Sequence, residues 1–371
     1  MPIPLFRPAI GAAEASAIAR VLRSKKLSRG KEVEQFEQDF AAYTKKRYAI
    51  AVNSGTSALH LLVRAIGWKK GDEVITTPFS FIASANALLF EGVTPVFVDI
   101  DPETLNIDVK KIEEKITPKT KGILLVHILG LPVQKQAIQA LIKKHHLTVI
   151  EDACEAVGRP SSTFPVAQIG AGSAYGFHEN KPLTSAGEGG MIVTDDPLLA
   201  KQCRALRDQG RATGPRWLEE VILGFNFRLT ELQAAFGAVQ LKRMDTLLAQ
   251  RRRIAERYTK QLANVPGISL PANKGPYERS WFIYYIICTT PALRTAIQEA
   301  LQASEITTST NYFPPIHRFP MYRRWNKKKT FPITEQTSQT LLALPCFPEL
   351  SLKEVDQVAS VIKKTINQYE S

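Results

Sequence analysis

Three short segments of the chain carry residue types that could do chemistry together. The first is Asn53-Ser54-Gly55-Thr56-Ser57, which lies between an apolar run and a helical pattern. A glycine lets the backbone approach an anion, and a helix start offers unpaired N–H groups with partial positive charge, so this segment could bind a phosphate. Ordinary capping of the helix by a hydroxyl explains the same pattern equally well.

The second segment is an acidic pair and the third is a lysine. Glu151 and Asp152 follow the apolar run 147–150, where an acid either caps the next helix or pairs with a buried cation. Lys181 lies between an apolar segment and the glycine-rich turn 187–190. An exposed lysine there would have no special role, but a buried one is a nucleophilic amine suited to a Schiff base.

Together the three segments match the needs of pyridoxal 5′-phosphate (PLP). The acidic pair follows Gly55 by about one hundred residues, and Lys181 follows Asp152 by about thirty. A phosphate cradle would hold the cofactor, a carboxylate would keep its pyridine nitrogen protonated, and a lysine would hold its aldehyde.

A scaffold of alternating strands and helices must position these segments. Short apolar runs predict strands at 49–53, 73–77, 95–98, 122–127 and 147–151. Helical spacing of apolar residues follows the first run, over 58–66, and precedes the last, over 138–142. This alternation predicts an α/β fold with a mainly parallel sheet covered on both faces, in which ligands bind at the carboxyl ends of the strands.

The remaining third of the chain predicts a second, smaller α/β unit. Helical spacing continues over 230–263, and a strand is expected at 281–288. Helices are expected at 291–303 and 351–368, and the segment 311–332, rich in proline and aromatics, predicts an ordered loop. We therefore expect a large domain, residues 1–245 with an N-terminal arm, and a C-terminal domain, residues 246–371.

Composition excludes several classes of protein. The chain has 371 residues, of which 44% are hydrophobic, so a large core is possible and a disordered chain is excluded. Its four cysteines form no CxxC pair, which argues against a disulfide scaffold or a zinc site and suits a reducing cytoplasm. No signal peptide is expected, because residues 1–7 do not form a basic-then-apolar leader. No membrane-inserting segment is expected, because the longest apolar stretch, 73–91, contains a proline and several polar residues.

A net charge of +13 suits an anionic substrate, although basic residues are most often only solvated surface. The densest basic cluster runs over 318–329. Nucleic-acid binding is not expected, because no helix-turn-helix and no aromatic-basic stacking face accompanies the charge.

The sequence resembles the sugar aminotransferases of the DegT/DnrJ/EryC1/StrS family over nearly its whole length. Several motifs in the family's order carry the resemblance, which makes it far more specific than any one of them. They are residues 3–11 (IPLFRPAIG), 52–60 (VNSGTSALH), 77–83 (TPFSFIA), 126–127 (VH), 151–156 (EDACEA), 177–181 (FHENK), 224–231 (GFNFRLTE), 317–322 (HRFPMY) and 344–350 (LPCFPEL).

The resemblance implies a fold and a set of residue roles. The fold would be that of aspartate aminotransferase, PLP fold type I, and Lys181 would be the Schiff-base lysine. Asp152 would pair with the pyridine nitrogen, Phe81 would stack on the ring, and Gly55 and Thr56 would hold the phosphate. Asn226 would reach the phosphate of the neighbouring subunit, so the active sites would be shared in a homodimer. Tyr312, His317 and Arg228 fall where the family contacts its substrate.

Several positions depart from the family pattern. Gly176 stands where many relatives have a phosphate-binding serine, and Ala186 is an apparent extra residue before the glycine-rich turn. Phe282 stands where histidine is frequent, and Ala171 replaces a common aspartate. Glu155 occupies a cofactor-contacting position often held by Gln or His, near the phenolic oxygen. A charged carboxylate would oppose a phenolate there, so we expect Glu155 to be protonated or turned away.

The activity that follows is amino transfer, with PLP and no metal. The resemblance implies a nucleotide-diphosphate-linked keto sugar as acceptor and L-glutamate as donor, in the synthesis of cell-surface polysaccharides or aminosugars. Another fold-type-I PLP reaction, such as decarboxylation or desulfuration, is the alternative, but the later motifs favour the sugar aminotransferases. A regulatory or binding protein that uses its basic surface is a further alternative.

Overall fold

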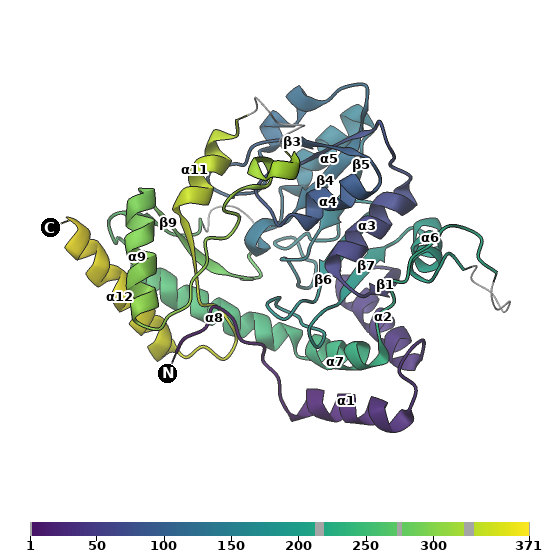
Figure 1. Ribbon diagram of the computed structural model, residues 1–371, viewed down its shortest axis with the longest axis horizontal. Coiled ribbons are helices and arrows are strands. Elements are labelled where there is room, and N and C mark those ends of the chain that lie inside the picture. Colours follow the sequence, from purple (N-terminus) through teal and green to yellow (C-terminus); the bar gives the residue numbers. More distant parts are fainter. Residues whose placement is uncertain (1, 212–218, 273–276, 323–329, 371) are drawn as a thin grey trace.

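A seven-stranded sheet forms the centre of the larger unit. The computed structural model describes residues 2–211, 219–272, 277–322 and 330–370 (Figure 1). The strand order is β1-β7-β6-β5-β4-β2-β3. The strands are β1 Tyr48–Val52, β2 Glu73–Thr76, β3 Thr94–Phe97, β4 Thr120–Val126, β5 Thr148–Asp152, β6 Gly172–Gly176 and β7 Gly190–Thr194. β7 is antiparallel to β1 and β6, and the pairs from β6 through to β3 are parallel, which confirms the α/β class and the mainly parallel sheet.

Alternate residues of each strand face opposite helical layers. Ile50 and Leu124 face the core shared with α3 (Gly55–Ile66), α4 (Ala83–Phe90) and α6 (Pro197–Arg207). Ala51 faces the layer of α2 (Lys31–Thr44) and α7 (Glu231–Lys242), and Leu125 faces α5 (Lys135–His145). Both faces of the sheet are therefore covered by helices and shielded from solvent, as a parallel sheet requires. A ligand can then bind only at the ends of the strands.

Caps fix where the helices next to the strand ends begin. The Ser54 hydroxyl accepts a hydrogen bond from the Ser57 N–H at the start of α3. Glu231 is buried at the start of α7, and its carboxylate accepts the Gly30, Glu32 and Val33 N–H groups at the start of α2. A carboxylate at a helix N-terminus satisfies otherwise unpaired donors and complements the helix dipole.

The smaller unit packs helices on a three-stranded sheet of order β10-β9-β8. Its strands are β8 Ile268–Ser269, β9 Tyr284–Cys288 and β10 Leu341–Leu344, and its helices are α8 Met244–Leu262, α9 Pro291–Ala303, α11 Pro332–Thr340 and α12 Leu352–Glu370. Figure 1 shows α9 and α12 side by side at the edge of the molecule, and the start of the chain beside them. Ile3 belongs to this core and forms a parallel bridge to Ile306.

Shorter elements complete the fold. Helix α1 (Ala12–Ser24) packs on α7 and lies outside the rest of the large unit in Figure 1. Single turns of 3-10 helix occur at Val109–Lys111, Glu113–Lys115, Ile128–Gly130, Ile316–Arg318 and Pro320–Tyr322. The division near residue 245 stays a prediction, although the contact of Ile3 ties the first residues to the C-terminal unit.

The helical segment predicted at 230–263 contains two helices, because α7 ends and α8 begins on either side of Arg243. One predicted strand differs from the structure, for an identifiable reason. The strand expected at 281–288 begins only at Tyr284. Trp281 has a φ of 52°, and the buried guanidinium of Arg251 donates to the carbonyls of Trp281 and Phe282, which therefore do not join the ladder.

The sequence expectations on membrane spans, metal sites and the basic cluster concern the chain as a whole. Within the ranges that the structure describes, no helix combines the length and apolar character needed to cross a bilayer. The same ranges contain no group of three or more His, Cys, Asp or Glu side chains able to hold a metal ion. Residues 323–329 of the basic cluster lie outside the described part, and Arg318 forms an ion pair with Glu335 at 2.7 Å.

Candidate active site

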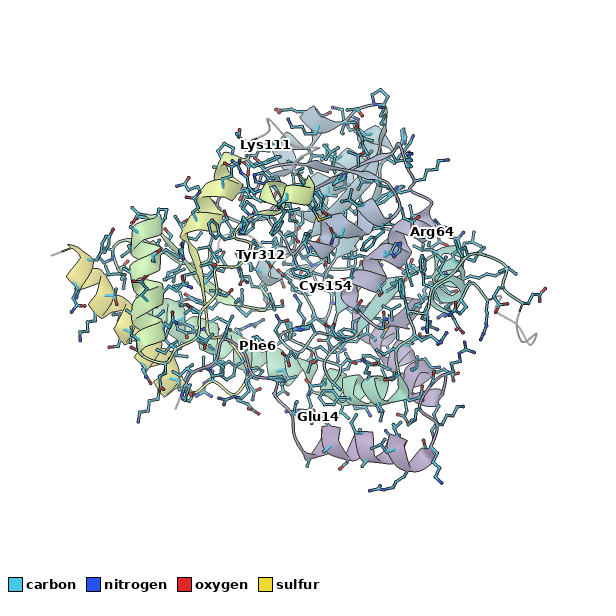
Figure 2. All side chains as sticks on the ribbon, in the orientation of Figure 1. Phe6, Glu14, Arg64, Lys111, Cys154 and Tyr312 are labelled. Atoms are coloured by element: carbon cyan, nitrogen blue, oxygen red, sulfur yellow. The ribbon has the colours of Figure 1, made fainter. Side chains whose placement is uncertain are left out.

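One cavity of about 370 Å³ lies beside the carboxyl ends of β4, β5 and β6. It brings together six of the predicted residues, namely Gly55, Thr56, Phe81, Asp152, Glu155 and Lys181. The other lining residues are Ser54, Leu59, Ser80, Ala83, Val126, Cys154, Gly176, His178, Asn180, Glu188 and Gly189. Figure 2 labels Cys154, which lines this cavity, near the middle of the molecule.

Lys181 is on the loop between β6 and β7. The Lys181 N–H donates to the His178 carbonyl, and the Phe177 N–H donates to the Gly189 carbonyl, so the loop folds back on itself. The side chain is 15% exposed, and its Nζ lies 3.7 Å from Glu155 Oε1 and 4.1 Å from the centre of the Phe282 ring. The lysine is therefore a largely buried amine inside the cavity.

The two acids at the end of β5 have different surroundings. Asp152 lines the cavity, and its carboxylate accepts the Ser84 hydroxyl at 2.7 Å and the Cys154 N–H at 3.1 Å. Because side chains of a strand alternate, Glu151 points to the opposite face of the sheet. Of the two acids, only Asp152 therefore faces the cavity.

Glu151 is held by a fully buried network. It accepts the N–H groups of residues 167, 169 and 170, the Ser173 hydroxyl and the His127 ring Nε2 at 2.9 Å. Since the Val133 N–H donates to His127 Nδ1, the ring proton lies on Nε2. Burial alone would raise the pKa of Glu151, but the His127 bond and the backbone donors lower it below its ordinary value.

The start of α3 forms the opposite wall of the cavity. The helix begins at Gly55, so its first-turn N–H groups and the Thr56 side chain are on this wall. A Cβ placed on Gly55 would lie 2.8 Å from Cys154 Sγ and 3.0 Å from the Gly176 Cα, so only glycine fits. Close backbone approach and a helix N-terminus are the usual means of holding a phosphate.

Phe81 is an exposed aromatic at the cavity. It is 63% exposed, so it is not part of the hydrophobic core. Burial of Cys154 raises the pKa of its thiol well above the ordinary value, and the nearby Asp152 carboxylate adds to the effect. The thiol therefore contributes shape to the site and no charge.

Glu155 and Tyr312 connect the two units at this cavity. The Tyr312 hydroxyl donates to Glu155 Oε1, and the Leu129 N–H donates to Oε2 at 2.8 Å. Burial, and then the neighbouring Glu155, raise the pKa of Tyr312 well above its ordinary value, so it remains a neutral donor. Glu155 is thus not turned away from the site: it faces Lys181.

Four predicted residues do not line this cavity: Tyr312, which reaches it only through Glu155, and three residues that lie elsewhere. His317 is buried against Phe331 and binds Glu335 at 2.9 Å, so its ring is committed elsewhere; burial lowers its pKa despite that acid. Arg228 lines a separate cavity and pairs with Asp208 at 2.5 Å. Asn226 is exposed on the surface, where it bridges to Asp208.

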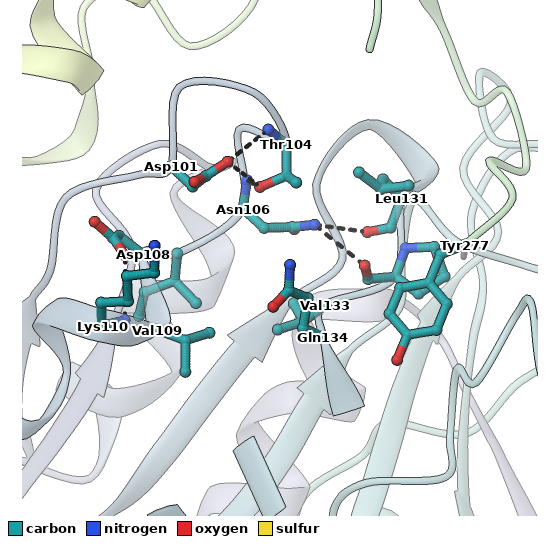
Figure 3. A pocket seen from close by; sticks show the side chains of 12 residues that line it. Asp101, Thr104, Asn106, Asp108, Val109, Lys110, Leu131, Val133, Gln134 and Tyr277 are labelled. Carbon is teal, nitrogen blue, oxygen red and sulfur yellow. Dashed lines mark hydrogen bonds between the residues drawn. The ribbon is translucent and has the colours of Figure 1, made fainter. Parts of the chain in front are cut away.

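A further cavity of about 120 Å³ contains none of the predicted residues. Figure 3 shows it where the segment after β3 meets the segment after β4, with Tyr277 at its side. The Asn106 amide donates to the carbonyls of Leu131 and Pro132, and its oxygen accepts the Ile128 N–H. The polar groups of Asn106 thus join two loops. One of these loops follows β4, whose last residue, Val126, lines the Lys181 cavity.

Sequence reasoning did not single out several groups that shape the Lys181 cavity. Ser84 and the Leu129 N–H orient the two carboxylates, and no local pattern distinguishes them. The replacement of the family's frequent histidine by Phe282 did point to this cavity, because the Phe282 ring lies over Lys181 Nζ.

The donor set of the cavity fits PLP. A lysine, a carboxylate with two fixed donors, an exposed aromatic and a glycine-led helix start surround one space. Lys181 could hold the aldehyde, Asp152 the pyridine nitrogen, and Gly55 with Thr56 the phosphate. These are the groups that a PLP site requires.

Comparison with known proteins identifies the family. Residues 8–363 match the DegT/DnrJ/EryC1/StrS aminotransferase family. The chain is 34% identical to GDP-perosamine synthase of Vibrio cholerae, over 98% of this chain and 99% of that protein. Helicobacter pylori PseC, an aminotransferase of pseudoaminic acid biosynthesis, superposes with a TM-score of 0.94 at 30% identity, covering 99% of this chain and 100% of that one. NtdA of Bacillus subtilis, solved with bound cofactor PMP, gives a TM-score of 0.90 at 32% identity, covering 97% and 83%.

The match spans nearly the whole chain, and the site within it has the groups that PLP needs. The relatives named above include aminotransferases and a structure with the amino form of this cofactor bound. The chain therefore belongs to the DegT/DnrJ/EryC1/StrS family and is a PLP-dependent aminotransferase of fold type I.

Proposed function

We propose that this aminotransferase transfers an amino group from L-glutamate to a nucleotide-diphosphate-linked keto sugar, in the synthesis of polysaccharides or aminosugars. The observation that carries the proposal is the convergence of Lys181, Asp152 and the α3 start on one cavity. The names of the relatives support the sugar substrate, and a net charge of +13 suits a diphosphate anion.

The chain's own groups would divide the work. When bound, PLP supplies an aldehyde that condenses with amines and a ring that withdraws electrons. Lys181 would hold the aldehyde and, once released, move a proton as general base and acid. Asp152, oriented by Ser84 and the Cys154 N–H, would keep the pyridine nitrogen protonated. Phe81 would cover the ring, and Gly55 and Thr56 would bind the phosphate.

A second copy of the chain would complete the site. Val221, Ile222 and Leu223 are consecutive exposed apolar residues, and Leu223 is 78% exposed. Exposed apolar residues in a row mark a surface that a partner covers. Asn226 follows them on the same exposed segment, so a homodimer that buries this segment could bring Asn226 to the partner's phosphate site. Arg228 would then lie close to that shared region.

Tyr312 and His317 take different parts in this proposal. Tyr312 would act at the cavity through Glu155, with which it shares a hydrogen bond. His317 would support the loop 311–322 through its contact with Glu335 and would not contact the substrate itself.

The state of the cysteines supports a place in the cytoplasm, because cysteines 154, 203, 288 and 346 are all free.

The proposed function is tested by identifying the lysine to which the cofactor is covalently attached. Purified protein with PLP should show a band near roughly 420 nm that borohydride removes, with the added mass on the peptide containing Lys181. Lys181→Ala and Lys181→Arg should keep the fold and lose turnover. A panel of nucleotide-linked keto sugars with glutamate as donor then identifies the acceptor. Borohydride labelling of another lysine would overturn the assignment.

A further inference from the structure

Two side chains lie close to the amine of Lys181. Glu155 Oε1 lies 3.7 Å from Nζ, and the Phe282 ring centre lies 4.1 Å from it. A carboxylate attracts an ammonium, and the face of an aromatic ring does so through its quadrupole. With the lysine side chain 15% exposed and that of Glu155 7% exposed, water screens this attraction only weakly.

Groups from both units hold this arrangement in place. The Leu129 N–H and the Tyr312 hydroxyl bind one carboxylate oxygen each, so Glu155 has little freedom to move. The Ser280 hydroxyl donates to the Glu155 carbonyl at 3.0 Å, which fixes the backbone two residues before Phe282. The ring and the carboxylate are therefore positioned relative to each other.

The other charged groups of the cavity have other partners. Asp152 accepts from Ser84 and the Cys154 N–H, and His178 and Glu188 approach each other at 3.9 Å where both are largely exposed. Among the residues that the structure describes, Glu155 is the one acid within 4.0 Å of Lys181 Nζ.

We propose that Glu155 and Phe282 form a resting position for the ammonium of Lys181, with Tyr312 as a positioning residue. The proposal rests on the assignment of Lys181 as the cofactor lysine. An aminotransferase frees this lysine when the cofactor carries the amino group and binds it again when the cofactor is an aldehyde. A position that stabilises the free ammonium therefore favours the amino form of the cofactor over the lysine-bound form.

The ratio of two dissociation constants isolates this effect. Pyridoxamine phosphate leaves Lys181 free, whereas pyridoxal phosphate occupies it, and both share the same ring and phosphate. Equilibrium dialysis with the cofactor-free full chain gives both constants at one pH. In Glu155→Gln the Kd of pyridoxal phosphate should fall relative to that of pyridoxamine phosphate by about five- to tenfold, because the released ammonium loses its partner.

Matched variants separate charge from shape. Phe282→Leu and Tyr312→Phe should move the ratio in the same direction by about two- to threefold, and Glu155→Asp should restore part of the wild-type ratio. Glu188→Gln removes an acid from the same cavity at an exposed position, and its ratio should stay at the wild-type value. Should Glu155→Gln fail to fold, Phe282→Leu and Tyr312→Phe provide the measurement.

Three outcomes overturn different statements. If borohydride places pyridoxal phosphate on Lys181 in every variant, yet the ratio stays within about twofold of wild type in Glu155→Gln, the resting position is wrong and the proposed function stands. If Glu188→Gln changes the ratio as much as Glu155→Gln, the change arises from the net charge of the cavity. The proposed resting position is then also wrong. If the label lies on another lysine, the proposed function itself fails.

Discussion

Cys154 Sγ lies close to the place where a side chain at position 176 would begin. A Cβ built on Gly176 would be 3.3 Å from that sulfur and 3.6 Å from the Gly55 Cα. The glycine that replaces the serine of many relatives therefore packs closely against the cysteine, in the cavity wall beside the start of α3.

Restoring serine at position 176 should crowd this wall unless the sulfur is removed. We expect Gly176→Ser to lower the free energy of unfolding by about 1 kcal/mol, because a tight wall resists added volume. Gly176→Ser combined with Cys154→Ala should recover most of that loss. Urea unfolding of the two single variants and the double variant measures the coupling. Strictly additive effects would show that the two positions do not compete for space.

Asp152→Asn should leave a folded, coloured protein with turnover slower by on the order of a hundredfold, because the electron-withdrawing ring loses its charged partner. The Ser84 hydroxyl and the Cys154 N–H also lose a charged acceptor, at a cost of about 1–3 kcal/mol in stability. Single-turnover kinetics and urea unfolding measure the two effects. Ser84→Ala, which keeps the carboxylate, serves as the control, and normal kinetics in Asp152→Asn would contradict the role.

Glu151 should make the fold sensitive to acid. Its pKa is lowered in the folded state, so its contribution to stability is complete above the ordinary carboxyl range and is lost as the pH falls through the lowered value. Glu151→Gln should therefore cost about 2–3 kcal/mol near neutral pH and progressively less below about pH 4. Unfolding free energies of both proteins across this range test the sign. A difference that stays constant with pH would show that the network does not depend on charge.

Mixing an inactive Lys181→Ala variant with a weakened Asn226→Ala variant tests the shared active site. In a heterodimer of Lys181→Ala and Asn226→Ala chains, a site that combines residues of both subunits would leave one site with both defects and the other intact. Single-turnover amination should then exceed the sum of the separate homodimers. Subunit exchange is verified by mass. With exchange established, activity no higher than that sum would place both residues in a site made by one chain.

The parts of the site that the sequence predicts are those fixed by local pattern. A glycine at a strand-to-helix turn, an acid at a strand end and a lysine before a glycine-rich turn each have a chemical signature, and the structure places all three at one cavity. The sequence could not separate Glu151 from Asp152, because strand alternation alone does not say which face holds the ligand. No local pattern around His317 predicts its contact with Glu335, which lies 18 residues later in the chain.

The fold shows the same division between local and long-range information. The strands from β1 to β5 lie within one or two residues of their expected positions, since apolar runs define them. The late start of β9 depends on Arg251, which lies about thirty residues earlier in the chain and takes the carbonyls of Trp281 and Phe282. No pattern within 281–288 announces that contact.

The pairing of Ile3 with the C-terminal unit has a consequence for synthesis on the ribosome. The Ile3 N–H donates to the Glu305 carbonyl, and the Ile3 carbonyl accepts the Thr307 N–H, both at 2.9 Å. Ile3 must therefore wait for a segment translated about three hundred residues later, while the seven-stranded sheet between the two can already form. Ile3 reaches its place only when the small unit is made, so it is among the last contacts to close in a nascent chain.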